Sequence, residues 1–133
     1  MSEPRLQTVA RYMSTRVITS DPEEHISQIA ASMQRDNVGS MVIMKGHRIV
    51  GILTERDFVA IVAKVGMLLK EDLGKNFMTK PFVTVQSDTS ITDAIKLMQA
   101  KHIRHLVVLD RNLRMVGVIS SRDLMKAAES MEL

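Results

Sequence analysis

The chain has 133 residues, of which 45% are apolar and 25% charged; this composition is typical of one soluble globular domain rather than of a disordered protein. It contains no cysteine, which excludes disulfide scaffolds, cysteine-ligated zinc and thiol nucleophiles. The net charge of +3 suits anionic ligands but is small for a dedicated nucleic-acid-binding protein. Aromatic residues make up only 3%, which argues against a base-stacking platform.

The hydropathy of the chain argues against a membrane segment. The longest apolar stretch, residues 58–69, is interrupted by Lys64 and Gly66 and is shorter than the ~20 apolar residues that cross a bilayer. The N-terminal sequence MSEPRLQTVARYM has no apolar core of signal-peptide length. We therefore expect a cytoplasmic protein without membrane contacts.

An internal repeat organises the whole sequence. At an offset of 65 positions (78 − 13), the two halves match at Met13 and Met78, Thr19 and Thr84, Ile26 and Ile91, Met33 and Met98, and Val42 and Val107. One residue is then inserted where 45–48 becomes 110–114, at a polar turn that tolerates an insertion. Beyond it the offset is 66, which matches Val50 with Val116, Gly51 with Gly117, Arg56 with Arg122, and Asp57 with Asp123.

The predicted elements follow the same order in each half. A short extended segment rich in β-branched residues comes first, at 17–19 and at 82–85. A one-sided helix follows, with its apolar stripe at Ile26, Ile29, Ala30 and Met33, and at Ile91, Ala94, Ile95 and Met98. Two apolar strands come next, at 41–44 and 49–53, and at 106–109 and 115–119. A last helix begins at Thr54 or at Ser120.

The starts of the first helices differ between the halves. Ser90 and Asp93 have the spacing of a capping box, whereas His25 and Gln28 occupy the matching positions and form a weaker cap. The methionines of these helices, Met33 and Met98, are interpreted as core residues.

The predicted fold is α+β, with two β-α-β-β-α repeats packed sheet to sheet around a pseudo-twofold axis. We expect the first repeat, with the N-terminal segment and the connecting helix, to span residues 1–72 and the second to span 73–133. Neither half buries much surface alone. The apolar residues 67–69 of the connector either pack against the other repeat or form a homodimer contact.

The most specific motif is Gly-h-h-[Thr/Ser]-x-Arg-Asp, where h is apolar, at 51–57 and again at 117–123. In the structural interpretation, Thr54 and Ser120 are N-caps and Asp57 and Asp123 are capping-box partners. In the functional interpretation, the free amides of the helix start and the neighbouring arginine attract a phosphate. An outward-facing aspartate would then bind both hydroxyls of a ribose.

These residues resemble a tandem pair of cystathionine-β-synthase-type domains, known as CBS domains or a Bateman module. Four segments carry the resemblance, in the same order in both halves, and it extends from about residue 9 to about residue 125. They are 38–42 (VGSMV), 51–58 (GILTERDF), 103–108 (IRHLVV) and 117–123 (GVISSRD).

The resemblance implies a regulatory module that binds AMP, ADP, ATP or S-adenosylmethionine in clefts between the repeats. It implies that Asp57 and Asp123 hold ribose hydroxyls and that Thr54 and Ser120 lie near the phosphate or ribose. The other implied contacts are the strand backbone at Ile18 and Val83 for adenine, and Gly39, Ser40, Arg104, His105, Arg56 and Arg122 for phosphate. Because Arg104 and His105 stand where the first repeat has Gly39 and Ser40, the two clefts differ in charge.

Three alternatives concern His102 and His105, which stand three residues apart. A metal site would need a third ligand at diagnostic spacing, which the sequence lacks, so we predict no metal. Phosphate contact by Arg104 or His105 and a plain solvated surface both remain open.

The sequence predicts a non-enzymatic protein, since no nucleophile–base–acid set, phosphate-binding loop or dinucleotide fingerprint occurs. Relatives of the family usually carry an attached effector. None is recognisable in this chain, so we expect it to signal to a separate effector protein, with an adenine nucleotide as ligand rather than as catalytic cofactor. The alternative is nucleic-acid binding through a basic surface that includes Arg104, Arg111, Arg114 and Arg122.

Overall fold

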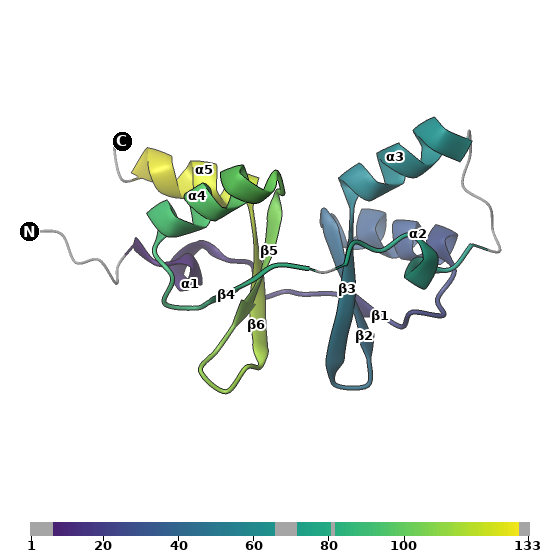
Figure 1. Cartoon of the computed structure of the whole chain (residues 1–133), viewed down its shortest axis with the longest axis horizontal. Helices are drawn as coiled ribbons and strands as arrows, with labels where there is room; N and C mark the ends of the chain where they lie inside the picture. The colour runs from purple at the N-terminus through teal and green to yellow at the C-terminus, as the bar shows by residue number, and fades with distance from the viewer. Residues whose placement is uncertain (1–6, 66–71, 81, 131–133) are drawn as a thin grey trace, which may run out of the picture. The chain divides into compact units, whose positions relative to one another are not determined.

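The computed structural model describes residues 7–65, 72–80 and 82–130 (Figure 1). The fold is α+β and contains two three-stranded sheets with the orders β1-β2-β3 and β4-β5-β6. In each sheet the first pair of strands is parallel and the second pair is antiparallel. The strands are β1 (Thr19–Ser20), β2 (Ser40–Lys45), β3 (Arg48–Thr54), β4 (Thr84–Gln86), β5 (His105–Leu109) and β6 (Met115–Ser120). The predicted β-α-β-β-α repeats are confirmed.

The four longer helices follow the predicted pattern. They are α2 (Ile26–Asp36), α3 (Glu55–Val65), α4 (Ile91–Lys101) and α5 (Ser121–Ser130). The capping prediction for α4 is confirmed, because Ser90 Oγ accepts a hydrogen bond of 3.0 Å from the Asp93 amide. His25 is the N-cap of α2 and makes no such side-chain bond. Within the described residues, no helix is long and apolar enough to cross a membrane.

Two short elements were not predicted from the sequence. One is α1 (Val9–Tyr12) and the other is a 3-10 turn, η2 (Gly74–Asn76). Both have too few residues to show an apolar period, so pattern analysis does not detect them. Tertiary contacts hold each of them in place: Val9 is fully buried, and Gly74 lies against Ile29.

The chain forms two compact units, one of which is made of two separate stretches of the sequence. The first-repeat unit is Val17–Phe82, and the second-repeat unit combines Met1–Arg16 with Val83–Leu133. In Figure 1, the purple α1 accordingly lies with the green and yellow elements of the second repeat. In each unit, the last strand of one repeat holds the segment that precedes the first strand of the other repeat.

Isolated β-bridges fasten these crossing segments. Ser14 exchanges backbone hydrogen bonds of 2.9 and 3.0 Å with Val118 on β6, and Thr79 exchanges bonds of 2.8 and 3.2 Å with Ile52 on β3. The two bridges occupy matching positions, since Thr79 and Ser14 are 65 residues apart (79 − 14). The duplication therefore includes the segment that precedes each first strand.

Each unit has its own apolar core between its sheet and its helices. Met33 and Met98 belong to these cores, as predicted, and both are 5% exposed. The central strands supply the other large buried side chains, among them Ile43, Leu53, Leu106 and Ile119. Leu53 and Ile119, which come just before the ends of β3 and β6, are therefore held in the cores. This packing positions the start of the helix that follows each strand.

Candidate functional site

In the first-repeat unit, the junction of β3 and α3 places Asp57 beside Thr54. The Thr54 amide and Oγ1 donate hydrogen bonds of 2.8 and 3.1 Å to Oδ2 of Asp57. The Asp57 amide reaches Thr54 Oγ1 at 3.4 Å. Asp57 is half-buried. The carboxylate is therefore fixed in the first turn of the helix, with Oδ2 occupied by the cap.

The same arrangement occurs in the second-repeat unit, where β6 meets α5. The Ser120 amide and Oγ donate hydrogen bonds of 2.9 and 3.0 Å to Oδ2 of Asp123. The Asp123 amide donates to Ser120 Oγ at 3.2 Å. Reciprocal bonds of this kind form a capping box, so the structural interpretation of the motif is confirmed in both repeats.

The expectation of free amides at these helix starts is wrong for most of them. At α3 the Glu55 amide donates to the Gly39 carbonyl at 3.1 Å, and at α5 the Ser121 amide donates to the Arg104 carbonyl at 2.9 Å. The Asp57 and Asp123 amides donate to the Thr54 and Ser120 hydroxyls as well. The first turn of each helix therefore leaves few backbone amides for an anion. Groups of the protein itself thus accept the hydrogen bonds of the helix-start amides. A hydroxyl residue followed three positions later by an acid favours this arrangement.

The predicted site residues of each repeat come together at one end of its sheet. Ser40 pairs with Thr54 across β2 and β3, and His105 pairs with Ser120 across β5 and β6. Gly39 and Arg104 are joined to the helix starts by the carbonyl bonds described above. Each repeat thus places a strand start, a hydroxyl and a carboxylate within one turn.

Ile18 and Val83, predicted to present backbone to adenine, lie just before β1 and β4. Their carbonyls accept hydrogen bonds from the amides of Val42 (3.2 Å) and Val107 (3.1 Å). Both side chains are partly buried against the cores. The two carbonyls are therefore engaged in the sheets.

The cationic residues lie outside these fixed groups. Arg56 and Arg122 are exposed at the second position of α3 and of α5, and Arg104 is exposed before β5. His105 is half-buried, in the place that Ser40 occupies in the other repeat. The two repeats therefore differ in charge at matching positions, as the sequence indicated.

Thr79 is a site residue that sequence reasoning missed. Its Oγ1 donates a hydrogen bond of 3.0 Å to Oδ1 of Asp57, 22 positions away in the chain. The repeat marks this position, because both Met13 and Met78 are followed by a hydroxyl residue, but it does not predict the contact. Only the bridge between Thr79 and Ile52 brings this hydroxyl to Asp57.

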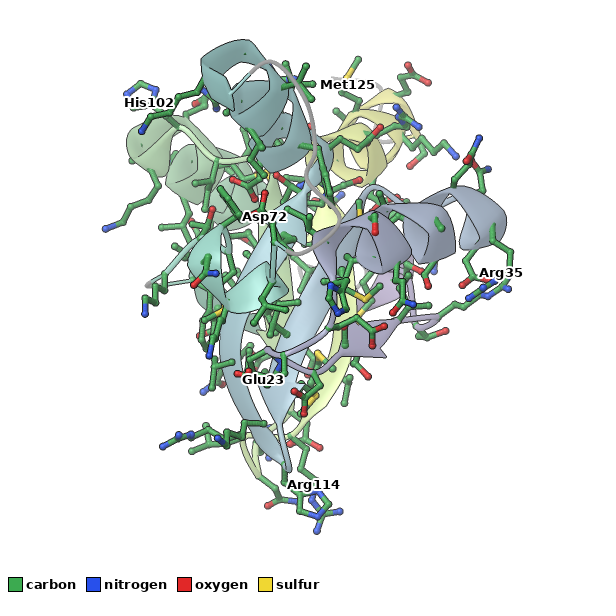
Figure 2. The ribbon with its side chains drawn as sticks, turned by 90° about the vertical axis from the view of Figure 1, so that its right-hand side faces the viewer. Glu23, Arg35, Asp72, His102, Arg114 and Met125 are labelled. Carbon is green, nitrogen blue, oxygen red and sulfur yellow. The ribbon has the colours of Figure 1, made fainter. Side chains whose placement is uncertain are left out.

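The described residues hold no group of three or more histidines, aspartates or glutamates placed to bind a metal ion. His102 ends α4 with a left-handed backbone conformation (φ 56°) and is exposed, whereas His105 begins β5. The two histidines therefore belong to different elements. Figure 2 shows His102 at the outer surface of the molecule.

The chain belongs to the CBS domain family, whose model matches residues 9–64 and 70–130. A protein of Methanopyrus kandleri is 35% identical over 111 residues, which cover 83% of this chain and 57% of that protein. This chain therefore spans little more than half the length of that relative. The resemblance drawn from the repeated motif is confirmed.

Solved structures share the fold. A CBS domain crystal structure is 30% identical, covers 92% of this chain and 98% of that one, and has a TM-score of 0.84. The CBS domain pair of the protein MJ0100, solved with 5-methylthioadenosine and S-adenosyl-L-methionine, has a TM-score of 0.82 at 22% identity. That alignment covers 93% of this chain and 97% of the other. At this identity the second likeness concerns the fold.

Proposed function

We propose that this protein is a regulatory module that binds adenosine-containing ligands and signals to a separate partner without catalysing a reaction. The observation that carries the proposal is the pair of fixed carboxylates at Asp57 and Asp123. Each has Oδ2 anchored by its own helix cap, so the carboxylate is held in one orientation and Oδ1 is the oxygen that the cap does not use. A vicinal diol is the ligand group that suits a preoriented carboxylate, since each hydroxyl donates one charge-assisted hydrogen bond.

The surroundings of the carboxylates support a phosphorylated nucleoside. Arg56 and Arg122 follow the capping hydroxyls and are exposed, and a guanidinium matches the fork geometry of phosphate. Because the backbone amides are mostly engaged, we assign the phosphate to these side chains and to Arg104 or His105. The adenosine derivatives bound to the CBS pair of MJ0100 support adenosine as the nucleoside.

A thermal-shift screen tests the proposal. AMP, ADP, ATP, S-adenosylmethionine, NAD and GMP would each be added at two salt concentrations. A ligand at about 100 times its Kd stabilises the folded state by roughly 2.7 kcal/mol, which raises the Tm by several degrees in a domain of this size. A shift with adenosine compounds and none with GMP is expected. No shift with any of them would contradict the proposal.

The salt dependence of the binding affinity distinguishes this proposal from nucleic-acid binding. If a nucleic acid were the main ligand, its affinity would fall steeply with salt and free nucleotides would compete weakly. For an adenosine ligand fixed by a diol and one phosphate, we expect a modest salt dependence. An oligonucleotide of mixed sequence, tested in the same buffers, supplies the comparison.

We further propose that the module acts as a homodimer. Of the four large apolar side chains that are exposed among the described residues, three lie on α3 and α5: Val59 (68%), Val62 (44%) and Met125 (64%). An apolar groove of about 290 Å³ runs beside Met125, between α4 and α5. The same kind of exposed helix in both repeats suits a self-complementary interface. The predicted contact at 67–69 lies outside the described residues.

Light scattering after gel filtration tests the dimer. The wild-type chain should have twice the mass of one chain, and Met125→Glu or Val59→Glu should reduce it to that of a monomer. Leu113→Glu, which changes the fourth exposed apolar residue on a hairpin instead of a helix, is the matched control and should stay dimeric. A monomeric wild-type protein would overturn this part of the proposal.

A further inference from the structure

The two carboxylates of the repeated motif are anchored alike but are not equally available. Oδ2 of each accepts two hydrogen bonds from its capping residue. The repeats differ at Oδ1. Thr79 Oγ1 donates to Oδ1 of Asp57 at 3.0 Å, whereas within residues 7–65, 72–80 and 82–130 no group donates to Oδ1 of Asp123.

The difference arises at one matched position. Ser14 corresponds to Thr79 and is held by the same kind of backbone bridge, to Val118 instead of Ile52. Its hydroxyl, however, faces the Arg16 carbonyl at 3.5 Å. Thus the same backbone arrangement delivers a hydroxyl to the carboxylate in one repeat and directs it away in the other.

The acceptor capacity of a carboxylate makes this difference consequential. An ionised carboxylate has about four acceptor positions. Asp57 uses three of them, two for Thr54 and one for Thr79. Asp123 uses two, both for Ser120. A vicinal diol needs two open positions, which Asp123 offers and Asp57 does not.

We infer that Thr79 is a specificity-determining residue that occupies Asp57 and confines ribose binding to Asp123. The inference rests on the proposed function, and it adds that one nucleotide binds per chain. Removing the Thr79 hydroxyl opens Asp57 as a second site. The Thr79 side chain is exposed, so a substitution of similar size at this position does not disturb a core.

Isothermal titration with AMP tests the inference. Wild-type protein should bind about one equivalent, and Thr79→Val, which keeps the shape of threonine without its hydroxyl, should bind about two. Thr79→Ser, which keeps the hydroxyl, should stay at one. Ser14→Ala is the matched control in the other repeat and should also stay at one. Circular dichroism would check that each variant is folded, and Thr79→Ala replaces Thr79→Val if the latter is not.

Aspartate variants assign the sites. Asp123→Asn should abolish AMP binding to the wild-type chain but leave one equivalent in the Thr79→Val background. Two equivalents in the wild type, dependence on Asp57 alone, or an unchanged stoichiometry in Thr79→Val would each overturn the inference and leave the proposed function standing. Wild-type protein that binds neither AMP nor S-adenosylmethionine would overturn both.

Discussion

The Met78 side chain packs directly against the Cα of Gly51, so that a Cβ on this glycine would lie 2.5 Å from the Met78 sulfur. Met13 stands in the same relation to Gly117, at 2.6 Å. The glycine of the repeated motif therefore accommodates a methionine of the crossing segment. Each glycine lies three residues before the capping residue of its repeat, so the crossing segment packs against the strand that leads to the site.

Alanine at these glycines should destabilise the protein unequally. The three atoms nearest to a Cβ at Gly51 all belong to the Met78 side chain, whose sulfur end can move, so we expect Gly51→Ala to cost about 1 kcal/mol. At Gly117 the Ser14 backbone carbonyl lies 2.8 Å from the added atom, and we expect Gly117→Ala to cost about 2–3 kcal/mol. Urea unfolding measures both. Equal losses of stability in the two variants would show that the backbone at Ser14 moves away from the added Cβ without cost.

The aspartates should contribute to stability in proportion to their bonds. Asp57→Ala removes hydrogen bonds to Thr54 and Thr79, whereas Asp123→Ala removes only those to Ser120. At about 1 kcal/mol net for each bond, Asp57→Ala should be the more destabilising by roughly that amount. Urea unfolding without ligand measures the difference. A larger loss in Asp123→Ala would contradict the bonding described here.

The N-cap of α4 should be worth about 1 kcal/mol. Ser90→Ala removes the acceptor of the Asp93 amide, and such replacements typically cost 0.5–2 kcal/mol. Ser90→Asp keeps an acceptor and is the control, with stability close to that of the wild type. A Ser90→Ala midpoint equal to the wild-type value would mean that water replaces the cap.

Leu113 should be a site of easy stabilisation. It is 72% exposed and has a left-handed backbone (φ 63°), a conformation that disfavours side chains with a Cβ by about 1 kcal/mol or more. Figure 2 shows its neighbour Arg114 at the end of the β5–β6 hairpin, away from the packed elements. Leu113→Asn should raise the free energy of unfolding by about 0.5–1 kcal/mol. Arg111→Asn, in the same hairpin without positive φ, should change it little.

Tyr12 provides a spectroscopic test of how α1 is attached. A hydrogen bond of 2.7 Å joins Tyr12 Oη and Ser130 Oγ, and it lowers the pKa of Tyr12 below the ordinary value of 10.0. Because Tyr12 is the single tyrosine and the chain has no tryptophan, tyrosinate absorbance reports it alone. Ser130→Ala should raise this pKa toward the ordinary value. An unchanged titration would place the cause elsewhere.

The sequence predicted the fold well because the repeat supplied two independent copies of each pattern. The helices at Ile26 and Ile91 and the paired apolar strands followed from periodicity and were confirmed. The crossing segments were missed because Ser14 and Thr79 make only isolated bridges, which leave no periodic trace. The contact between Thr79 and Asp57 depends on that tertiary bridge, so no local motif could indicate it.

A comparison of AMP with its 2′-deoxy analogue on the wild-type protein shows whether a fixed carboxylate binds the ribose diol. Isothermal titration should show binding of AMP that weakens about tenfold or more when one hydroxyl is removed, since a hydrogen bond to a charged group contributes roughly 1.5–3 kcal/mol. Equal affinity for the two nucleotides would mean that the 2′-hydroxyl makes no hydrogen bond to Asp123, and it would overturn the proposed binding of ribose by this carboxylate.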